Sequence, residues 1–119
     1  MKIALTSKGK DLDSDLDERF GRARYFIVYD TETESFETID NEQNLNSAQG
    51  AGVQAAETIA KTGAASLVTG HCGPKAFRAL TAAGIKVFTT NATTVKEALD
   101  LYLAGKLTEA DNADVEGHW

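Results

Sequence analysis

The residues of this chain that are best suited to chemistry lie in one short stretch, Gly70-His-Cys-Gly-Pro-Lys75. It contains the only cysteine, one of the two histidines beside it, and the only proline. A thiolate and an imidazole are ligands for iron, copper or molybdenum. Because proline is favoured at the first position of a helix, this pair precedes a helix N-terminus, where backbone N–H groups and the macrodipole attract an anion. The stretch indicates part of a site for an anionic metal–sulfur cluster. The alternative is an ordinary strand-to-helix turn with a buried, inert thiol.

His71 and Cys72 are candidate metal ligands, but two ligands cannot build a four-cysteine iron–sulfur site or a closed structural zinc site. Any cluster must therefore arrive largely preassembled and be held by charge, backbone donors and at most one or two bonds. Nucleophilic catalysis by Cys72 would require a positioned base and an orienting third group. His71 is adjacent in sequence, so it points elsewhere if the backbone is extended. We expect no enzymatic activity.

A second candidate group is basic and consists of Arg19, Arg22 and Arg24 around the pair Phe20-Gly21. The guanidinium group is always charged and donates hydrogen bonds in a fixed fork, so three of them could hold an anion. The alternative is that these arginines only offset the five acidic residues between positions 11 and 18. The sequence favours neither interpretation.

Small residues form the third candidate group, because Gly50-Ala51-Gly52 opens a predicted helix and would let its N-terminus approach an anion closely. The spacing is not that of a dinucleotide-binding fingerprint, and glycines at helix starts often have only a structural purpose. The predicted cofactor-binding residues are therefore Arg19, Phe20, Gly21, Arg22, Arg24, Gly50, Ala51, Gly52, Gly70, Gly73 and Lys75.

The elements that must position these residues follow from hydrophobic periodicity and from capping signals. We predict strands at 1–6, 25–30, 35–40, 65–69 and 85–88, helices at 50–61, 74–83 and 95–103, and loops at 7–24 and 41–49. A hairpin followed by right-handed crossovers gives an α/β domain with a mixed five-stranded sheet in the order 3-2-1-4-5. Strand 2 is antiparallel, and helices cover both faces.

The predicted topology places the candidate groups at one edge of the sheet. The connections at 7–24, 41–49, 70–73 and 89–93 all lie at the carboxyl ends of the parallel strands. Open α/β sheets bind ligands at this edge, where neighbouring connections diverge. The divergence here falls between strands 1 and 4, so we expect the loop at 7–24 to face the loop at 70–73.

Composition limits the possible partners. Twelve Lys and Arg against 18 Asp and Glu give a formal net charge of −6, which argues against nucleic acid. No apolar run approaches the roughly 20 residues that span a membrane. One cysteine and no signal-peptide pattern predict a cytoplasmic protein. We expect a monomer with a single cluster-binding domain at 1–107 and an acidic, flexible tail at 108–119.

Four stretches, at 17–26, 50–52, 70–77 and 83–87, carry a resemblance to a known family. The chain resembles the dinitrogenase iron–molybdenum cofactor biosynthesis family, which includes NifX, the C-terminal domain of NifB, and NafY. Within this family it is closest in type to the orange protein of sulfate-reducing bacteria. The similarity extends to about Leu107. It implies a ribonuclease-H-like three-layer α/β/α fold and a non-catalytic role.

What the resemblance implies for function is binding or carriage of a metal–sulfur cluster that contains molybdenum with copper or iron, held mainly non-covalently. Many relatives have His-Phe-Gly where this chain has Arg19-Phe20-Gly21. Because Arg19 cannot ligate a metal but can pair with an anion, this departure favours electrostatic holding. Two alternatives stay open. One is a metal-free interaction or regulatory module that contacts an ATPase or a cofactor-biosynthesis protein, and the other is a binder of a small phosphorylated anion.

Overall fold

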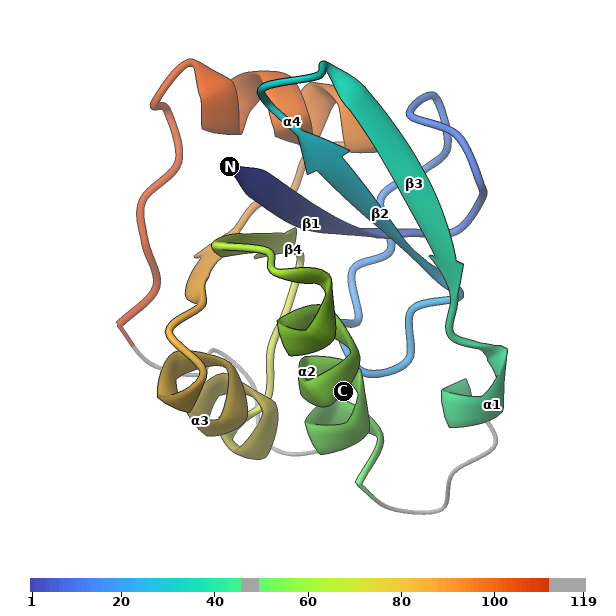
Figure 1. The fold of residues 1–119 in the computed structure, drawn as a ribbon, viewed down its shortest axis with the longest axis vertical. Coiled ribbons are helices and arrows are strands. Elements are labelled where there is room, and N and C mark those ends of the chain that lie inside the picture. Colours follow the sequence, from blue (N-terminus) through green and yellow to red (C-terminus); the bar gives the residue numbers. More distant parts are fainter. Residues whose placement is uncertain (46–49, 112–119) are drawn as a thin grey trace.

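The strands and helices of this chain are arranged around one mixed sheet with the order β3-β2-β1-β4-β5 (Figure 1). The computed structural model describes residues 1–45 and 50–111. The strands are β1 (Lys2–Ser7), β2 (Tyr25–Asp30), β3 (Ser35–Asp40), β4 (Ser66–Thr69) and β5 (Lys86–Thr89). The helices of the described part are α1 (Glu42–Leu45), α2 (Ala51–Thr62), α3 (Pro74–Ala82) and α4 (Val95–Leu103).

Strand pairing follows the predicted topology. β2 is antiparallel to both β1 and β3, whereas β4 is parallel to β1 and to β5. The predicted strand order and strand directions are therefore confirmed, and each predicted boundary is within one or two residues of the observed one. The more specific ribonuclease-H-like assignment stays a prediction.

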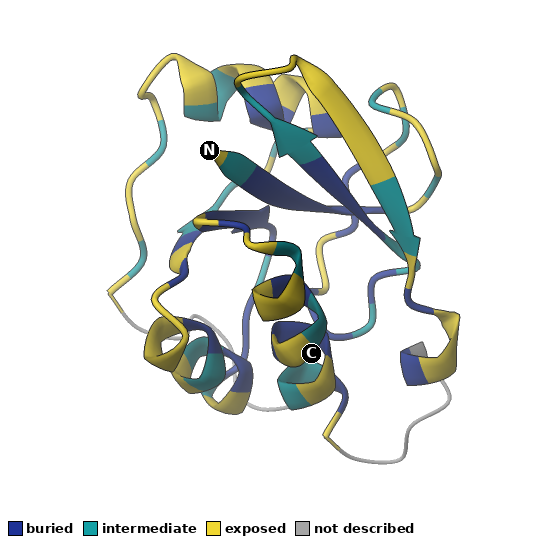
Figure 2. Cartoon of the chain, viewed as in Figure 1, coloured by how far each residue is buried: buried dark blue, intermediate teal, exposed yellow. Residues whose placement is uncertain are grey.

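Each face of the sheet has its own hydrophobic core, because side chains alternate between the two faces along a strand. Figure 2 shows buried residues along β1 and β4 and on the inner sides of the helices. The core beneath α2 and α3 includes Phe20, Phe26, Ile59, Cys72 and Leu80. The core beneath α4 includes Ile3, Leu5, Leu16, Val68 and Leu99.

The long connection between β1 and β2 passes from one core to the other. Leu16 packs in the core beneath α4, and Phe20 packs in the core beneath α2 and α3. Residues 17–19 must therefore cross the carboxyl edge of the sheet. The connection is anchored along its length, since the N–H of Leu16 donates to Thr93 O at 3.0 Å. Because the connection at 7–24 changes from one core to the other, its sequence has neither a helical nor a strand period.

The predicted polar loop at 41–49 was wrong in part, because residues 42–45 form the short helix α1. Asn41, just before it, is buried, and its side-chain amide donates to Gly21 O at 3.3 Å and to Ala23 O at 2.8 Å. The asparagine thus ties the start of α1 to the end of the long connection. Three asparagines at 41–46 were the sequence signal. Residues 46–49 lie outside the described residues.

The chain beyond α4 continues along the outer edge of β5. The N–H of Ala110 donates to Val87 O at 2.8 Å, and Glu109 forms an antiparallel bridge with Phe88. The predicted division into a domain at 1–107 and a tail at 108–119 stays a prediction, and residues 112–119 lie outside the described part.

Candidate functional site

Two connections meet at the carboxyl edge of the sheet as a short parallel ladder. The N–H of His71 donates to Glu18 O at 2.6 Å, and the N–H of Phe20 donates to His71 O at 3.2 Å. This makes Arg19 and His71 bridge partners, and paired residues of a ladder project from the same side. Their neighbours Phe20 and Cys72 are fully buried on the other side. The predicted meeting of the loops at 7–24 and 70–73 is therefore confirmed.

Gly70 makes this close approach possible. A Cβ at residue 70 would lie 2.6 Å from Glu18 Cα and 2.8 Å from Glu18 O. Both atoms belong to the backbone and cannot rotate away. Of the predicted site residues, Gly70 thus has a defined structural purpose, which is to let the two connections touch.

Asp17 also lies at this edge. It was not among the predicted site residues, and from the sequence it was only one of the five acids of the long connection. Its side chain is 2 % exposed, and its Oδ1 accepts from the N–H of Arg19 at 3.1 Å. The same oxygen lies 3.6 Å from Arg19 Nε. The signal in the sequence was the Asp-x-Arg spacing, because an aspartate often accepts from the backbone two residues ahead.

Arg24 belongs to a different part of the edge. Its guanidinium stacks over Tyr25, 4.4 Å from the ring centroid, and forms ion pairs with Asp40 and Glu42. The pKa of Asp40 is lowered by the hydrogen bond from the backbone N–H of Glu42 and by Arg24. The hydrogen bond to Asp40 raises the pKa of Arg24 in turn. Arg24 is thus paired with acids of β3 and α1, whereas Arg19 is paired with Asp17.

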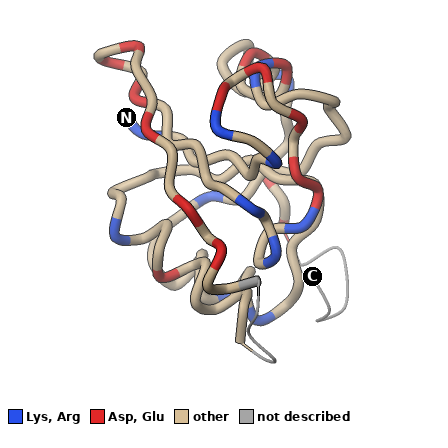
Figure 3. Tube along the Cα trace, turned by 90° about the vertical axis from the view of Figure 1, so that its right-hand side faces the viewer, with Lys and Arg blue, Asp and Glu red and all other residues tan. Residues whose placement is uncertain are grey.

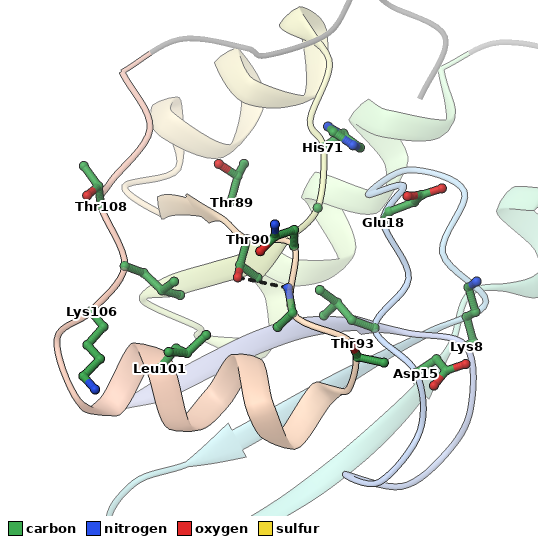
Figure 4. A pocket seen from close by; sticks show the side chains of 15 residues that line it. Lys8, Asp15, Glu18, His71, Thr89, Thr90, Thr93, Leu101, Lys106 and Thr108 are labelled. Atoms are coloured by element: carbon green, nitrogen blue, oxygen red, sulfur yellow. Dashed lines mark hydrogen bonds between the residues drawn. The ribbon is translucent and has the colours of Figure 1, made fainter.

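A cleft of about 900 Å³ opens on the β5 side of His71 (Figure 4). Lys8 and Lys106 stand at opposite ends of it, and Asp15 and Glu18 also face it. Its other lining residues are Leu16, Gly70, His71, Thr89, Thr90, Asn91, Ala92, Thr93, Leu101, Leu107 and Thr108. Of the predicted site residues, all of which are described, only Gly70 and His71 line this cleft. None of its threonines was predicted from the sequence to contact a ligand.

The cleft is mixed in charge, because two lysines face two carboxylates. Along the long connection, a block of five acidic residues at 11–18 lies between basic residues on either side (Figure 3). The cleft is therefore not a purely cationic binding site for an anion. Four threonine hydroxyls, which can donate or accept hydrogen bonds, also line it.

The starts of α2 and α3 lie at the same edge and have no side-chain caps. Gly50 precedes α2 with φ 76°, and Gly73 precedes α3 in an extended conformation. The two helices approach closely, since a Cβ at Gly52 would lie 2.9 Å from the Cβ of Ala76. By contrast, the start of α4 is capped. The Thr94 hydroxyl accepts from the N–H of Glu97, and the N–H groups of residues 95 and 96 donate to Ser14 O and Leu12 O. The N-cap glycines of α2 and α3 thus offer no side-chain acceptor to their helix starts at this edge of the described structure.

Within residues 1–45 and 50–111, no three His, Cys, Asp or Glu side chains gather closely enough to hold a metal ion. The thiol of Cys72 is fully buried and lies 3.7 Å from Gly73 O. His71 is partly exposed and lines the cleft. This donor set fits a preassembled cluster with at most one bond to a side chain, and it does not fit a site built by the protein around bare metal ions.

The geometry of this edge does not by itself identify a protein family, but similarity to known proteins does. The family model described as dinitrogenase iron-molybdenum cofactor matches residues 1–105. The chain belongs to this family.

Two solved structures are similar to this chain over nearly its whole length, and a further relative is similar in sequence. The apo form of the orange protein from Desulfovibrio gigas is 43 % identical, with a TM-score of 0.93 and 96 % of each chain covered. The NMR structure of a proposed NifB protein from Thermotoga is 38 % identical, with a TM-score of 0.85 and 98 % of each chain covered. An uncharacterised protein of Methanocaldococcus jannaschii is 31 % identical over 111 residues, which is 90 % of this chain and 93 % of the relative.

The described helices of this family member are all too short or too polar to cross a membrane.

Proposed function

We propose that this chain binds and carries a preassembled, anionic metal–sulfur cluster that contains molybdenum with copper or iron, and that it catalyses no reaction itself. Membership of the dinitrogenase iron-molybdenum cofactor family supports this proposal. So does the similarity to the orange protein, whose structure is described as an apo form. The cluster is thus a substrate that the protein receives and passes on, and not a resident cofactor.

The observation that carries the proposal is the gathering of anion-binding elements at one edge. Arg19, the partly exposed His71 and the uncapped starts of α2 and α3 all lie at the carboxyl edge of the sheet. Free backbone N–H groups and a guanidinium favour a negative charge without forming covalent bonds. These elements suit a cluster that is held mainly by charge and hydrogen bonds.

The site residues in this proposal keep distinct roles. His71 is the accessible side chain that can ligate a metal, and buried Cys72 is its near neighbour. Arg19 pairs with the anion, and Gly50, Gly52, Gly73 and Lys75 belong to the two helix starts that donate N–H groups. The cargo contains molybdenum together with copper or iron. A cofactor-biosynthesis protein or an ATPase of the cytoplasm supplies or receives it.

Anaerobic purification from the native host tests this function directly. The proposal expects visible absorption of the purified protein together with molybdenum and either copper or iron by elemental analysis. In parallel, the metal-free protein is incubated with tetrathiomolybdate and cuprous ion and then desalted. A colourless, metal-free protein that also takes up none of this probe would refute the proposal and favour the metal-free interaction module.

A matched pair of variants locates the cargo. Arg19→Ala removes a cation at the proposed site, and Arg78→Ala removes an exposed cation from the middle of α3. The proposal expects Arg19→Ala alone to weaken retention of the probe, and increasingly so as salt is raised, since salt screens exposed charges. Equal retention by the two variants would place the cargo elsewhere.

A further inference from the structure

The geometry points to Asp17 as a positioning residue for cargo binding: we propose that its buried carboxylate orients the guanidinium of Arg19 beside His71. This inference rests on the proposed function. It assigns a purpose to a buried acid that would otherwise oppose an anionic cargo.

Asp17 is held rigidly at the junction of β1 and β4. Its N–H donates to Thr6 O at 3.1 Å, and its carbonyl accepts from the Thr6 hydroxyl at 2.5 Å. The Thr6 hydroxyl also lies 2.9 Å from the hydroxyl of Thr69, the last residue of β4. The backbone of Asp17 is thus fixed to the ends of both central strands.

The carboxylate of Asp17 fixes Arg19 in two ways. Oδ1 accepts from the backbone N–H of Arg19, which sets the direction in which the chain turns toward His71. The same oxygen faces Nε of the side chain at 3.6 Å, and it is the only acidic partner of Arg19 in the described structure. A carboxylate on the Nε side leaves the far edge of the guanidinium, formed by N–H groups of its two terminal amino groups, directed away from it.

Exposure of the two side chains agrees with this arrangement. The Asp17 side chain is 2 % exposed, whereas that of Arg19 is 48 % exposed. The acid is therefore inside, and the outer part of the guanidinium faces solvent. An arginine side chain normally loses rotamer freedom when it binds, and a prior contact that restricts it reduces this loss.

Charge and positioning predict opposite effects for the same substitution. If Asp17 acted only through its charge, Asp17→Asn would remove a repulsive carboxylate and strengthen binding of an anion. If Asp17 orients Arg19, the same substitution weakens binding. Asparagine keeps an oxygen that can accept from the Arg19 backbone N–H, so the loop retains that hydrogen bond.

The test is a double-mutant cycle with Asp17→Asn, Arg19→Ala and the double variant, titrated anaerobically with tetrathiomolybdate and cuprous ion. We expect each single substitution to weaken binding about tenfold, the usual scale for one charge-assisted contact, and the double variant to bind no more weakly than Arg19→Ala. Tighter or unchanged binding by Asp17→Asn would overturn the inference. A loss of affinity for the probe by the same factor when Asp17→Asn is introduced into the wild-type and into the Arg19→Ala background would also overturn the inference. It would show a general structural effect that does not act through Arg19.

Two further measurements keep the inference testable if Asp17→Asn folds poorly or if the wild-type protein takes up no probe. Arg19→Lys keeps the positive charge but lacks Nε, so it should bind about as weakly as Arg19→Ala, and wild-type affinity would contradict the inference. In the unloaded protein, the Nε–H proton of Arg19 should give a distinct NMR signal that Asp17→Asn removes. Persistence of that signal would refute the contact, whereas failure of probe uptake alone would count against the proposed function only.

Discussion

Gly70 and Glu18 are in such close backbone contact that a methyl group on residue 70 would lie 2.6 Å from the Cα of Glu18. This contact joins the end of β4 to the connection that leaves β1. It allows the hydrogen bond from His71 N to Glu18 O and places Arg19 beside His71. The candidate site therefore depends on the absence of a side chain at one position.

Gly70→Ala should lower the free energy of unfolding by about 3 kcal/mol, because overpacking against backbone atoms cannot be relieved by side-chain rotation. Urea unfolding measures the change. We also expect the amide resonances of Arg19 and His71 to shift, since the ladder between them must separate.

Gly63→Ala is the matched control for this substitution. Gly63 has φ 80° with no atom within 4 Å of an added Cβ, so alanine there meets backbone strain but no clash. We expect a cost of about 1 kcal/mol and no change at Arg19 or His71. A Gly70→Ala variant that is no less stable than Gly63→Ala would show that the two connections can move apart freely.

Gly52→Ala tests the contact between α2 and α3. Alanine is the better helix former by about 0.5–1 kcal/mol in a helix interior, and Gly52 lies in the first turn of α2, where the gain is smaller. Here the new Cβ would lie 2.9 Å from the Cβ of Ala76, and we expect a net destabilisation of about 1–2 kcal/mol. Thermal and urea unfolding measure it.

The double variant Gly52→Ala/Ala76→Gly provides the control. With the Ala76 methyl group removed, the nearest atom of residue 76 is its Cα at 3.7 Å, which is ordinary van der Waals contact. The steric part of the loss should disappear, so the two substitutions should be non-additive. Simple addition of the two single effects would contradict the close packing of these helices.

The Arg24–Asp40 pair predicts a specific pH dependence. The pKa of Asp40 lies below its ordinary value of 3.8, first because of the N–H of Glu42 and then because of Arg24. A depressed folded pKa means that this carboxylate contributes stability above pH 3.8 and loses it as pH falls through the folded pKa. NMR titration should show that Arg24→Gln raises the pKa only partway, since the backbone hydrogen bond remains. Lys96→Gln, at an exposed pair on α4, should leave it unchanged.

Cys72 should be inert to thiol reagents in the native protein. Its side chain is fully buried in the core beneath α2 and α3, so modification requires local opening. We expect its reaction with a disulfide reagent to be slower by more than about a hundredfold than in denaturant. Cys72→Ala should retain the tetrathiomolybdate–copper probe within about twofold of wild type. A complete loss of retention in a folded Cys72→Ala protein would instead assign the thiol as a ligand.

The amino-acid sequence by itself determined the order and direction of the strands. Period-2 apolar runs, glycine stops and the Thr94 capping signal are local features, and right-handed crossovers then leave one sheet order. The same logic located the meeting of the loops at 7–24 and 70–73. These predictions succeeded because each depends on neighbouring residues or on the general handedness of the chain.

Tertiary structure alone decided which charged groups pair and which side chains reach the edge. Arg19, Arg22 and Arg24 look equivalent in sequence, yet Arg19 is held by buried Asp17 and Arg24 by Asp40 of β3. His71 and Cys72 are adjacent, yet one lines the cleft and the other lies in the core. Such differences arise from contacts between segments far apart in the chain, such as Gly70 against Glu18. The local sequence pattern does not predict these contacts. Which distant segments meet is decided only when the two cores pack against the connection whose residues 17–19 cross the edge of the sheet.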